Sequence, residues 1–136
     1  MKTIIAGGRD FSNYQFLSES CKLFIPKITK VISGTAKGAD QLGEKFAKEN
    51  SIEILYFKPD WNKFGKSAGF IRNEEMAKNA DMLIAFWDGK SKGTQHMIKC
   101  ATKLGLEVHI LNYWSSKSSI LSILSFDFSS ASHSSK

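Results

Sequence analysis

The sequence predicts an α/β protein with a three-layer, Rossmann-like fold around a mainly parallel sheet of five strands or more. Three observations lead to this fold class. Short apolar runs alternate with amphipathic segments, several of these runs end at glycine or Asp-Gly, and 136 residues suffice for one domain but not for two. Such alternation implies parallel strands joined by helices that cover both faces of the sheet.

The predicted strands are short apolar runs that each stop at a strand-breaking residue. The first ends at Gly7-Gly8, the second at Gly34, and the fourth, which is the most apolar, ends at Asp88-Gly89. In chain order they span residues 2–6, 30–33, 53–57, 82–87 and 107–111. The carboxyl ends of these strands should meet at one edge of the sheet, where ligands of open α/β sheets bind.

Helices are predicted between the strands, over residues 12–24, 39–50, 71–79 and 93–104. Ser12 is the expected N-cap of the first, and Gly105 ends the last. The second helix is amphipathic, since Leu42, Phe46 and Ala47 fall on one face. Residues 60–69 read as a long loop in which at least one ring, Trp61 or Phe64, belongs to the core.

Composition excludes several classes of protein. No apolar run approaches the roughly 18–20 residues that a membrane helix needs, and the N-terminus does not resemble a signal peptide. Cys21 and Cys100 lack a Cys-x-x-Cys spacing and fall in predicted helices, which favours a reducing, cytoplasmic location. We therefore expect no membrane partner, no metal and no cofactor. The net charge of +6 suits nucleic acid or a phosphate-bearing ligand, but it equally suits simple solubility.

The last part of the chain differs from the rest. Of residues 115–136, eleven are Ser. We expect one α/β domain to cover residues 1–114 and a Ser-rich tail, residues 115–136, to follow it. Within the tail, residues 120–128 are apolar enough to pack as a short helix or an edge strand, and the residues from Ser129 onward are expected to be disordered.

Four glycine-containing segments follow predicted strands and contain the candidate site. Glycine lets backbone amides approach a phosphate closely, and a following helix adds the positive end of its dipole. Because one sheet edge would gather the segments, their combination is more informative than any one of them. The candidate ligand-binding residues are Gly7, Gly8, Arg9, Gly34, Lys37, Gly38, Asp40, Arg72, Asn73, Asp88, Ser91, Gly93 and Thr94.

Structural alternatives exist for several of these residues. The glycines could serve only tight turns, and Ser91 or Thr94 could cap the last helix. Asp40 could bind a ribose hydroxyl or a base edge, but a capping or structural role is slightly favoured over direct catalysis. In the third segment, residues 60–73, basic side chains alternate with aromatic rings, which suits stacking on a base and pairing with phosphate. We expect Arg72, at the start of its helix, and the amides of Gly93 and Thr94 to hold a phosphate.

Hydrolytic motifs are scarce. The sequence contains neither a Walker loop nor Gly-x-Gly-x-x-Gly, no Ser in a nucleophile-elbow pattern and no metal-ligand spacing. His96 is more simply interpreted as a residue on a helix surface than as a base. Glu75 is one turn before Lys78, so the two are expected to pair.

The combination of motifs resembles the YspA-type branch of the SLOG superfamily, which joins DNA-processing protein A with the "lonely guy" phosphoribohydrolases. The resemblance covers roughly residues 1–112 and implies a Rossmann-like nucleotide-binding fold of a kind common in bacteria and phages. The motifs that carry it are Ala-Gly-Gly-Arg-Asp-Phe (6–11), Ser-Gly-Thr-Ala-Lys-Gly-Ala-Asp (33–40), Asp-Trp (60–61), Gly-Lys-Ser-Ala-Gly (65–69), Arg-Asn-Glu-Glu-Met-Ala (72–77) and Ala-Phe-Trp-Asp-Gly-Lys-Ser-Lys-Gly-Thr (85–94).

Comparison with the phosphoribohydrolases separates binding from catalysis. Arg72 matches their Arg and Gly93-Thr94 matches their Gly-Thr, but their catalytic Glu falls on Met97, which cannot act as an acid or base. If the protein cleaves an N-glycosidic bond, another group must serve. The catalytic candidates are Arg72, Asp88 and Glu74, with Asp10 as a further carboxylate.

These observations favour a protein that binds a nucleotide or nucleotide-derived phosphate ligand, as a sensor or by sequestration. Two alternatives remain open. One is a nucleotide hydrolase of the N-glycosidic, phosphoribohydrolase type, and the other is a single-stranded DNA-binding protein of the DNA-processing A type. The expected partner is a small nucleotide-derived molecule, with nucleic acid ranked lower. Self-association is expected only by resemblance, since phosphoribohydrolases are usually dimers.

Overall fold

The computed structural model, which describes residues 1–113, confirms the predicted fold class. Five strands form one sheet in the order β3-β2-β1-β4-β5, and every neighbouring pair is parallel. The order reverses between β1 and β4, because the chain first adds strands on one side of β1 and then on the other. The strands are β1 (Lys2–Gly7), β2 (Lys30–Ser33), β3 (Glu53–Tyr56), β4 (Met82–Trp87) and β5 (Glu107–Asn112).

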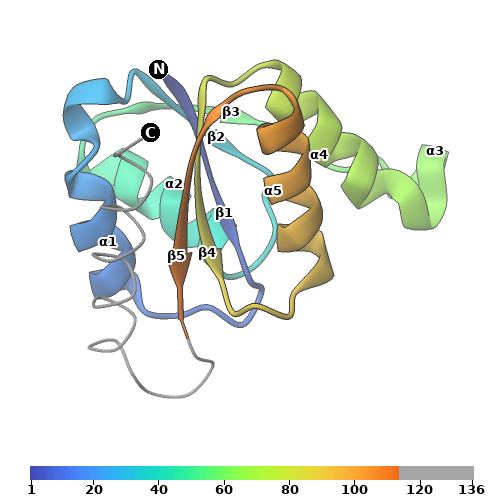
Figure 1. Cartoon of the computed structure of the whole chain (residues 1–136), viewed down its shortest axis with the longest axis horizontal. Coiled ribbons are helices and arrows are strands. Elements are labelled where there is room, and N and C mark those ends of the chain that lie inside the picture. Colours follow the sequence, from blue (N-terminus) through green and yellow to red (C-terminus); the bar gives the residue numbers. More distant parts are fainter. Residues whose placement is uncertain (114–136) are drawn as a thin grey trace.

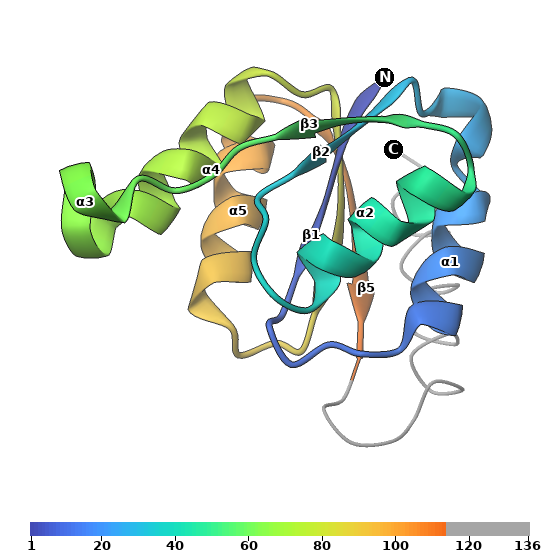
Figure 2. The ribbon, with the colours of Figure 1, turned by 180° about the vertical axis from the view of Figure 1, so that it is seen from behind.

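Helices cover both faces of the sheet, which makes three layers. Helices α1 (Tyr14–Lys22) and α2 (Ala39–Glu49) lie on one face, and α4 (Ala68–Lys78) and α5 (Lys92–Lys103) on the other (Figures 1 and 2). Alternate residues of β1 serve the two cores, since Ile5 packs with α1 and α2 while Ile4 packs with α4 and α5. Both side chains are fully buried.

The start of α1 differs from the sequence prediction. Asn13, not Ser12, is the N-cap, and its side chain accepts a hydrogen bond from the Phe16 amide (3.0 Å). Ser and Asn are both good N-cap residues, so the sequence alone cannot choose between these two neighbouring positions. The helix also ends earlier, at Lys22, and a short 3₁₀ turn, η1 (Ile25–Lys27), contains the proline.

The segment expected to be a loop is mostly helical, which is a second correction. It forms α3 (Trp61–Phe64) and the 3₁₀ turn η2 (Gly65–Ser67), and α4 follows directly. Asp60 caps α3 by accepting the Lys63 amide (3.1 Å). The prediction of a core ring was wrong, because Trp61 is 50% exposed and Phe64 39%. Figure 1 shows why: α3 extends away from the three-layer body.

The longer α4 places Arg72 and Asn73 in its second turn rather than at its start. The last helix, α5, begins at Lys92 and is capped by Ser91, which confirms one of the two predicted caps. Both cysteines lie in helices as expected, Cys21 in α1 and Cys100 in α5.

Two further points concern the extent of the chain. None of the helices within residues 1–113 is long and apolar enough to cross a membrane. The expectations for the Ser-rich tail, including a packed element over residues 120–128, lie outside the described residues.

Candidate functional site

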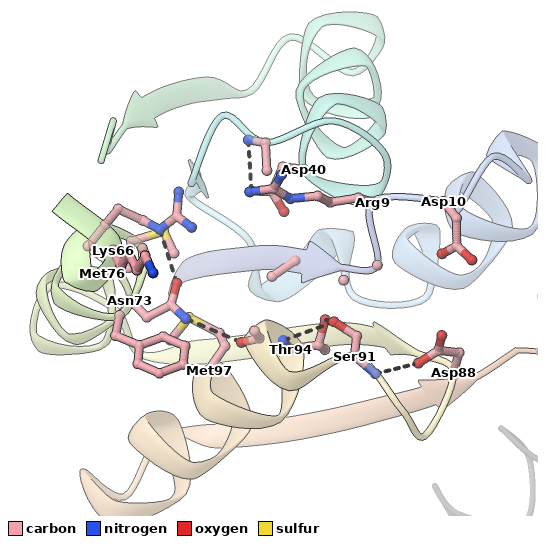
Figure 3. A pocket seen from close by; sticks show the side chains of 18 of the residues that line it. Arg9, Asp10, Asp40, Lys66, Asn73, Met76, Asp88, Ser91, Thr94 and Met97 are labelled. Carbon is pink, nitrogen blue, oxygen red and sulfur yellow. Dashed lines mark hydrogen bonds between the residues drawn. The ribbon is translucent and has the colours of Figure 1, made fainter. Parts of the chain in front are cut away.

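A pocket of about 460 Å³ opens at the carboxyl ends of β1 and β4, where the strand order reverses. This is the place at which open α/β sheets bind ligands, because the two flanking connections diverge and leave a crevice. The loop after β1, the start of α5 and the buried face of α4 form its walls (Figure 3). Its lining residues are Ala6, Gly7, Gly8, Arg9, Asp10, Ala36, Asp40, Trp61, Lys66, Gly69, Phe70, Arg72, Asn73, Met76, Asp88, Ser91, Gly93, Thr94 and Met97.

The loop after β1 packs closely against its neighbours. The Gly8 amide donates to the carbonyl of Phe86 (3.2 Å), and the Gly8 carbonyl accepts from Phe11 (3.3 Å) and Ala39 (3.2 Å). A Cβ on Gly7 would lie 2.3 Å from the carbonyl oxygen of Phe86. The glycines are therefore needed for backbone packing around the pocket, which agrees with their structural interpretation and leaves open whether they also contact a ligand.

The loop after β4 is folded by the side chain of Asp88. Its Oδ1 accepts the amides of Lys90 and Ser91, each at 2.8 Å. Partial burial alone would raise the pKa of Asp88, but the amides of Ser91, Lys90 and Asp88 itself and the charge of Lys90 together outweigh burial and lower that pKa. Asp88 is thus an ionised group engaged in turn formation, which weakens its candidacy as a catalytic acid.

The N-terminus of α5 faces the pocket. Ser91 Oγ accepts the Thr94 amide (3.3 Å), so that amide is already bonded within the helix cap. Within residues 1–113 the Gly93 amide has no such partner, and a Cβ on Gly93 would meet no atom within 4 Å. Of the two amides predicted to hold a phosphate, only that of Gly93 is open to a ligand.

Asp40 is buried beside the loop after β2. Its side chain is 5% exposed, and Oδ2 accepts the Ala36 amide (3.1 Å), whereas α2 has Gly38 as its N-cap with no side-chain bond. Asp40 therefore does not cap α2, but it has the structural role that the sequence also favoured, since its carboxylate shapes the preceding loop. Burial raises the pKa of Asp40 to about 6, against the opposing effects of the Ala36 amide and of two arginines, Arg72 and Arg9.

Arg72 links α4 to the loop after β2 and, through Asn73, to α5. Its Nη1 donates to the carbonyl of Gly34 after β2, and its Nε donates to Oδ1 of Asn73 (3.0 Å). Asn73 in turn donates to the Gly93 carbonyl (3.3 Å) and lies 3.2 Å from Nδ1 of His96 in α5. Burial lowers the pKa of Arg72, while the nearby Asp40 carboxylate acts in the opposite direction. Arg72 thus holds a desolvated cation at the pocket wall.

The structure gathers most of the sequence-predicted residues. All of the candidate ligand-binding residues line this pocket except Gly34 and Lys37, which line an adjoining pocket of about 420 Å³, and Gly38. Gly38 lines neither pocket and packs on the carbonyls of Gly8 and Arg9.

Sequence reasoning assigned this segment to the site but missed several of the lining residues that α3, η2 and α4 contribute. Treating residues 60–69 as a loop hid the helical spacing that brings these side chains to one side. The lining residues left out of the predicted set there are Trp61, Lys66, Gly69, Phe70 and Met76. The alternation of aromatic and basic residues indicated a binding segment, but it did not indicate which of these side chains face the pocket.

The catalytic candidates are placed unequally. Glu74 does not line this pocket; it lines a separate pocket between α4 and α5, together with His96 and Cys100. Glu75 pairs with Lys78 as predicted (3.9 Å). Met97 lines the pocket and is 1% exposed, so the position at which phosphoribohydrolases carry Glu holds an apolar side chain here. Within residues 1–113 no His, Cys, Asp and Glu side chains cluster as a metal site.

The parallel sheet with this strand order, and the pocket at its switch point, define a Rossmann-like domain. A family model described as "YspA, cpYpsA-related SLOG family" matches residues 1–64. Gene 61 protein of Mycobacterium phage D29 is 36% identical over 84 residues, which cover 57% of this chain and 67% of that protein. The chain belongs to the YspA-related SLOG family.

A solved structure, that of DNA processing protein A from Streptococcus pneumoniae, has the same fold. It superposes with a TM-score of 0.70 at 14% identity, over 91% of this chain and 56% of that one. The chain therefore spans little more than half the length of that protein. At this identity the likeness concerns the fold alone.

Proposed function

We propose that the protein binds a nucleotide or nucleotide-derived phosphate ligand in the pocket at the switch point, as a sensor or by sequestration. The observation that carries the proposal is the meeting of Arg72 and the open Gly93 amide across one pocket at the end of β1 and β4. A desolvated guanidinium and the N-terminus of a helix both favour a negatively charged group.

The rest of the pocket suits the nucleoside part of such a ligand. Phe70 and Trp61 line it and are each about half exposed, with values of 48% and 50%. One face of Phe70 is already stacked on His96, with ring centroids 4.1 Å apart. The other face of Phe70 and the ring of Trp61 offer stacking surfaces for a base beside the cationic wall. The buried sulfur side chains of Met76 and Met97 add an apolar floor.

A hydrolase acting on nucleotides is a second candidate because the pKa of one carboxyl group in the pocket is close to neutral pH. Asp40, with its pKa of about 6, has the property expected of a general acid or base, unlike the ionised Asp88. Single-stranded DNA binding is a third candidate, favoured by the net charge of +6 and the exposed rings.

A thermal-shift screen followed by incubation distinguishes the three. The full chain is tested with nucleoside mono-, di- and triphosphates, cyclic dinucleotides, ADP-ribose derivatives and a single-stranded oligonucleotide. A ligand that raises the unfolding temperature and is recovered intact supports binding, and one that is consumed supports the hydrolase. Stabilisation by the oligonucleotide alone, lost at high salt, supports DNA binding instead.

Arg72→Ala tests the assignment of the phosphate group. The substitution removes a charge-assisted hydrogen bond, so the affinity for the ligand found in the screen should fall by more than ~1 kcal/mol. Calorimetric titration measures it. Lys78→Ala on the outer side of the same helix is the control and should leave affinity unchanged. Wild-type affinity in a folded Arg72→Ala variant would contradict the assignment.

A further inference from the structure

We infer that the ligand carries two separate phosphate groups and spans two adjoining pockets, as a small dinucleotide does. The inference rests on the proposed function and deepens it by naming the ligand class. It starts from the second pocket, of about 420 Å³, which is lined by Arg9, Gly34, Thr35, Ala36, Lys37, Lys58, Pro59, Trp61 and Arg72.

The two pockets adjoin along a common wall. Arg9, Ala36, Trp61 and Arg72 line both of them. A ligand in the first pocket therefore lies against the same two guanidinium groups as one in the second. Each pocket has a volume within the usual range for a small-molecule site, so together they exceed what a mononucleotide needs.

The second pocket is more strongly cationic than the first. Its lining residues include the two shared arginines together with Lys37 and Lys58, and they include no carboxylate. The first pocket, by contrast, is lined by three carboxyl groups and three cations, which balance in formal charge: Asp10, Asp40 and Asp88 against Arg9, Lys66 and Arg72. An anion would be attracted to the second pocket with no carboxylate among its lining residues to oppose it.

Trp61 stands between the two pockets. Its ring carbon Cη2 would lie 3.6 Å from a Cβ on Gly69, and Nη2 of Arg72 would lie 3.8 Å from the same point. The ring and the guanidinium thus converge over a glycine that leaves the space between them open. This arrangement suits a base or ribose between two phosphate groups, held by stacking and by the cation.

The first pocket has a closed floor, which favours a small ligand over a continuous strand. Met76 and Met97 are each 1% exposed and line its inner end, from α4 and α5 (Figure 3). A nucleic-acid strand that entered there could not continue past these side chains. A ligand with a free end fits the closed floor.

Calorimetric titration of the full chain tests the inference with probes of defined phosphate number. Three kinds of probe would be compared for each of the four bases. Nucleoside 5′-monophosphates have one phosphate group, and dinucleotides without a terminal phosphate have only the internal one. Dinucleotides with a 5′-phosphate have two phosphate groups. The 5′-phosphorylated dinucleotide of the preferred base should bind roughly ten-fold more tightly than either one-phosphate probe, the gain expected from one charge-assisted contact.

Two pairs of variants locate the second phosphate. Lys37→Ala with Lys58→Ala should abolish the ten-fold gain, because it should weaken the two-phosphate probe by about ten-fold more than it weakens the monophosphate. Lys22→Ala with Lys48→Ala removes the same charge from exposed positions outside both pockets and should change neither. Trp61→Ala should weaken the dinucleotide, whereas Phe64→Ala on the same short helix should not, because Phe64 lines neither pocket.

The outcomes separate this inference from the proposed function. Tight monophosphate binding with no gain from the second phosphate overturns this inference alone, as does an equal loss for all probes in the Lys37 and Lys58 variant. Affinity that keeps rising from two to eight nucleotides also overturns it, because a strand would then be the ligand. If no nucleotide of any length binds, the proposed function itself fails.

Discussion

At the scale of single residues, Asp40 and the arginines beside it dominate the electrostatics of the pocket. Asp40 is a buried carboxyl group whose negative form is favoured by Arg72 and Arg9 but opposed by loss of water. Desolvation prevails, so the pKa of Asp40 rises to about 6. This makes the stability of the fold depend on pH through this group.

Asp40→Asn should remove that dependence. Because the folded-state pKa of Asp40 lies above its unfolded value of about 4, its contribution is fully present below pH 4 and is lost as the pH rises through about 6. Relative to the Asn variant, the wild type should lose on the order of 2 kcal/mol of unfolding free energy between pH 4 and 7. Urea denaturation across this range measures it, and parallel curves for the two proteins would contradict the assignment.

Gly38 is a residue whose role follows from backbone contact. It has φ +80°, and a Cβ there would lie 2.3 Å from the Gly8 carbonyl oxygen and 2.6 Å from that of Arg9. Gly89 has a similar φ of +83° but no atom within 4 Å of its Cβ position.

The pair Gly38→Ala and Gly89→Ala should therefore differ in cost, since Gly38 has close backbone contacts and a ψ of −128°, outside the left-handed helical region that other residues occasionally adopt. Gly89→Ala should cost about 1–2 kcal/mol of unfolding free energy for the left-handed backbone alone. Gly38→Ala should cost about 1–3 kcal/mol more, because the loop after β1 must move. Chemical denaturation of both variants measures the difference, and equal costs would show that the loop yields freely.

At the scale of elements, the boundaries of α1 and α3 depended on particular hydrogen bonds. Ser12 and Asn13 are both good N-caps, and only the geometry places the side-chain oxygen Oδ1 of Asn13 within hydrogen-bond distance of the Phe16 amide. Likewise Asp60 turns a segment rich in glycine and lysine into the start of a helix. Which of two adjacent residues caps a helix depends on where the preceding strand or loop positions the backbone.

Asn13→Ala and Ser12→Ala should differ in effect. Loss of the Asn13 cap should lower the unfolding free energy by about 1 kcal/mol, whereas Ser12, which is exposed and contributes only its carbonyl to the turn, should change it by less than ~0.5 kcal/mol. Thermal and urea unfolding measure both. A larger loss of unfolding free energy in Ser12→Ala than in Asn13→Ala would show that Ser12 is the N-cap, as the sequence predicted.

At the scale of the whole molecule, β1 joins two cores into one unit. Ile4 and Ile5 are adjacent and fully buried, yet they pack against helices on opposite faces. The central position of β1, paired with β2 and β4, means that neither core can open without disturbing this strand.

Ile4→Ala and Ile5→Ala should each lower the unfolding free energy by about 2–5 kcal/mol, as expected for large-to-small changes in a core. Both variants should still unfold in one transition, with coincident curves from circular dichroism and fluorescence. Leu23→Ala, at a position 63% exposed, is the control and should have little effect. Separate transitions for the two faces would show that the cores are independent.

The sequence by itself determined the fold class, the strands to within about one residue at their ends, and the strand ends at which the pocket lies. These follow from hydrophobic periodicity and from strand-breaking residues, which act locally. Only the tertiary structure decided the strand order, the burial of Asp40, the bridge from Arg72 to Gly34, and the wall made by α3 and α4. Each of these depends on which distant segments pack together, and burial and charge at a site are properties of that packing rather than of any one segment.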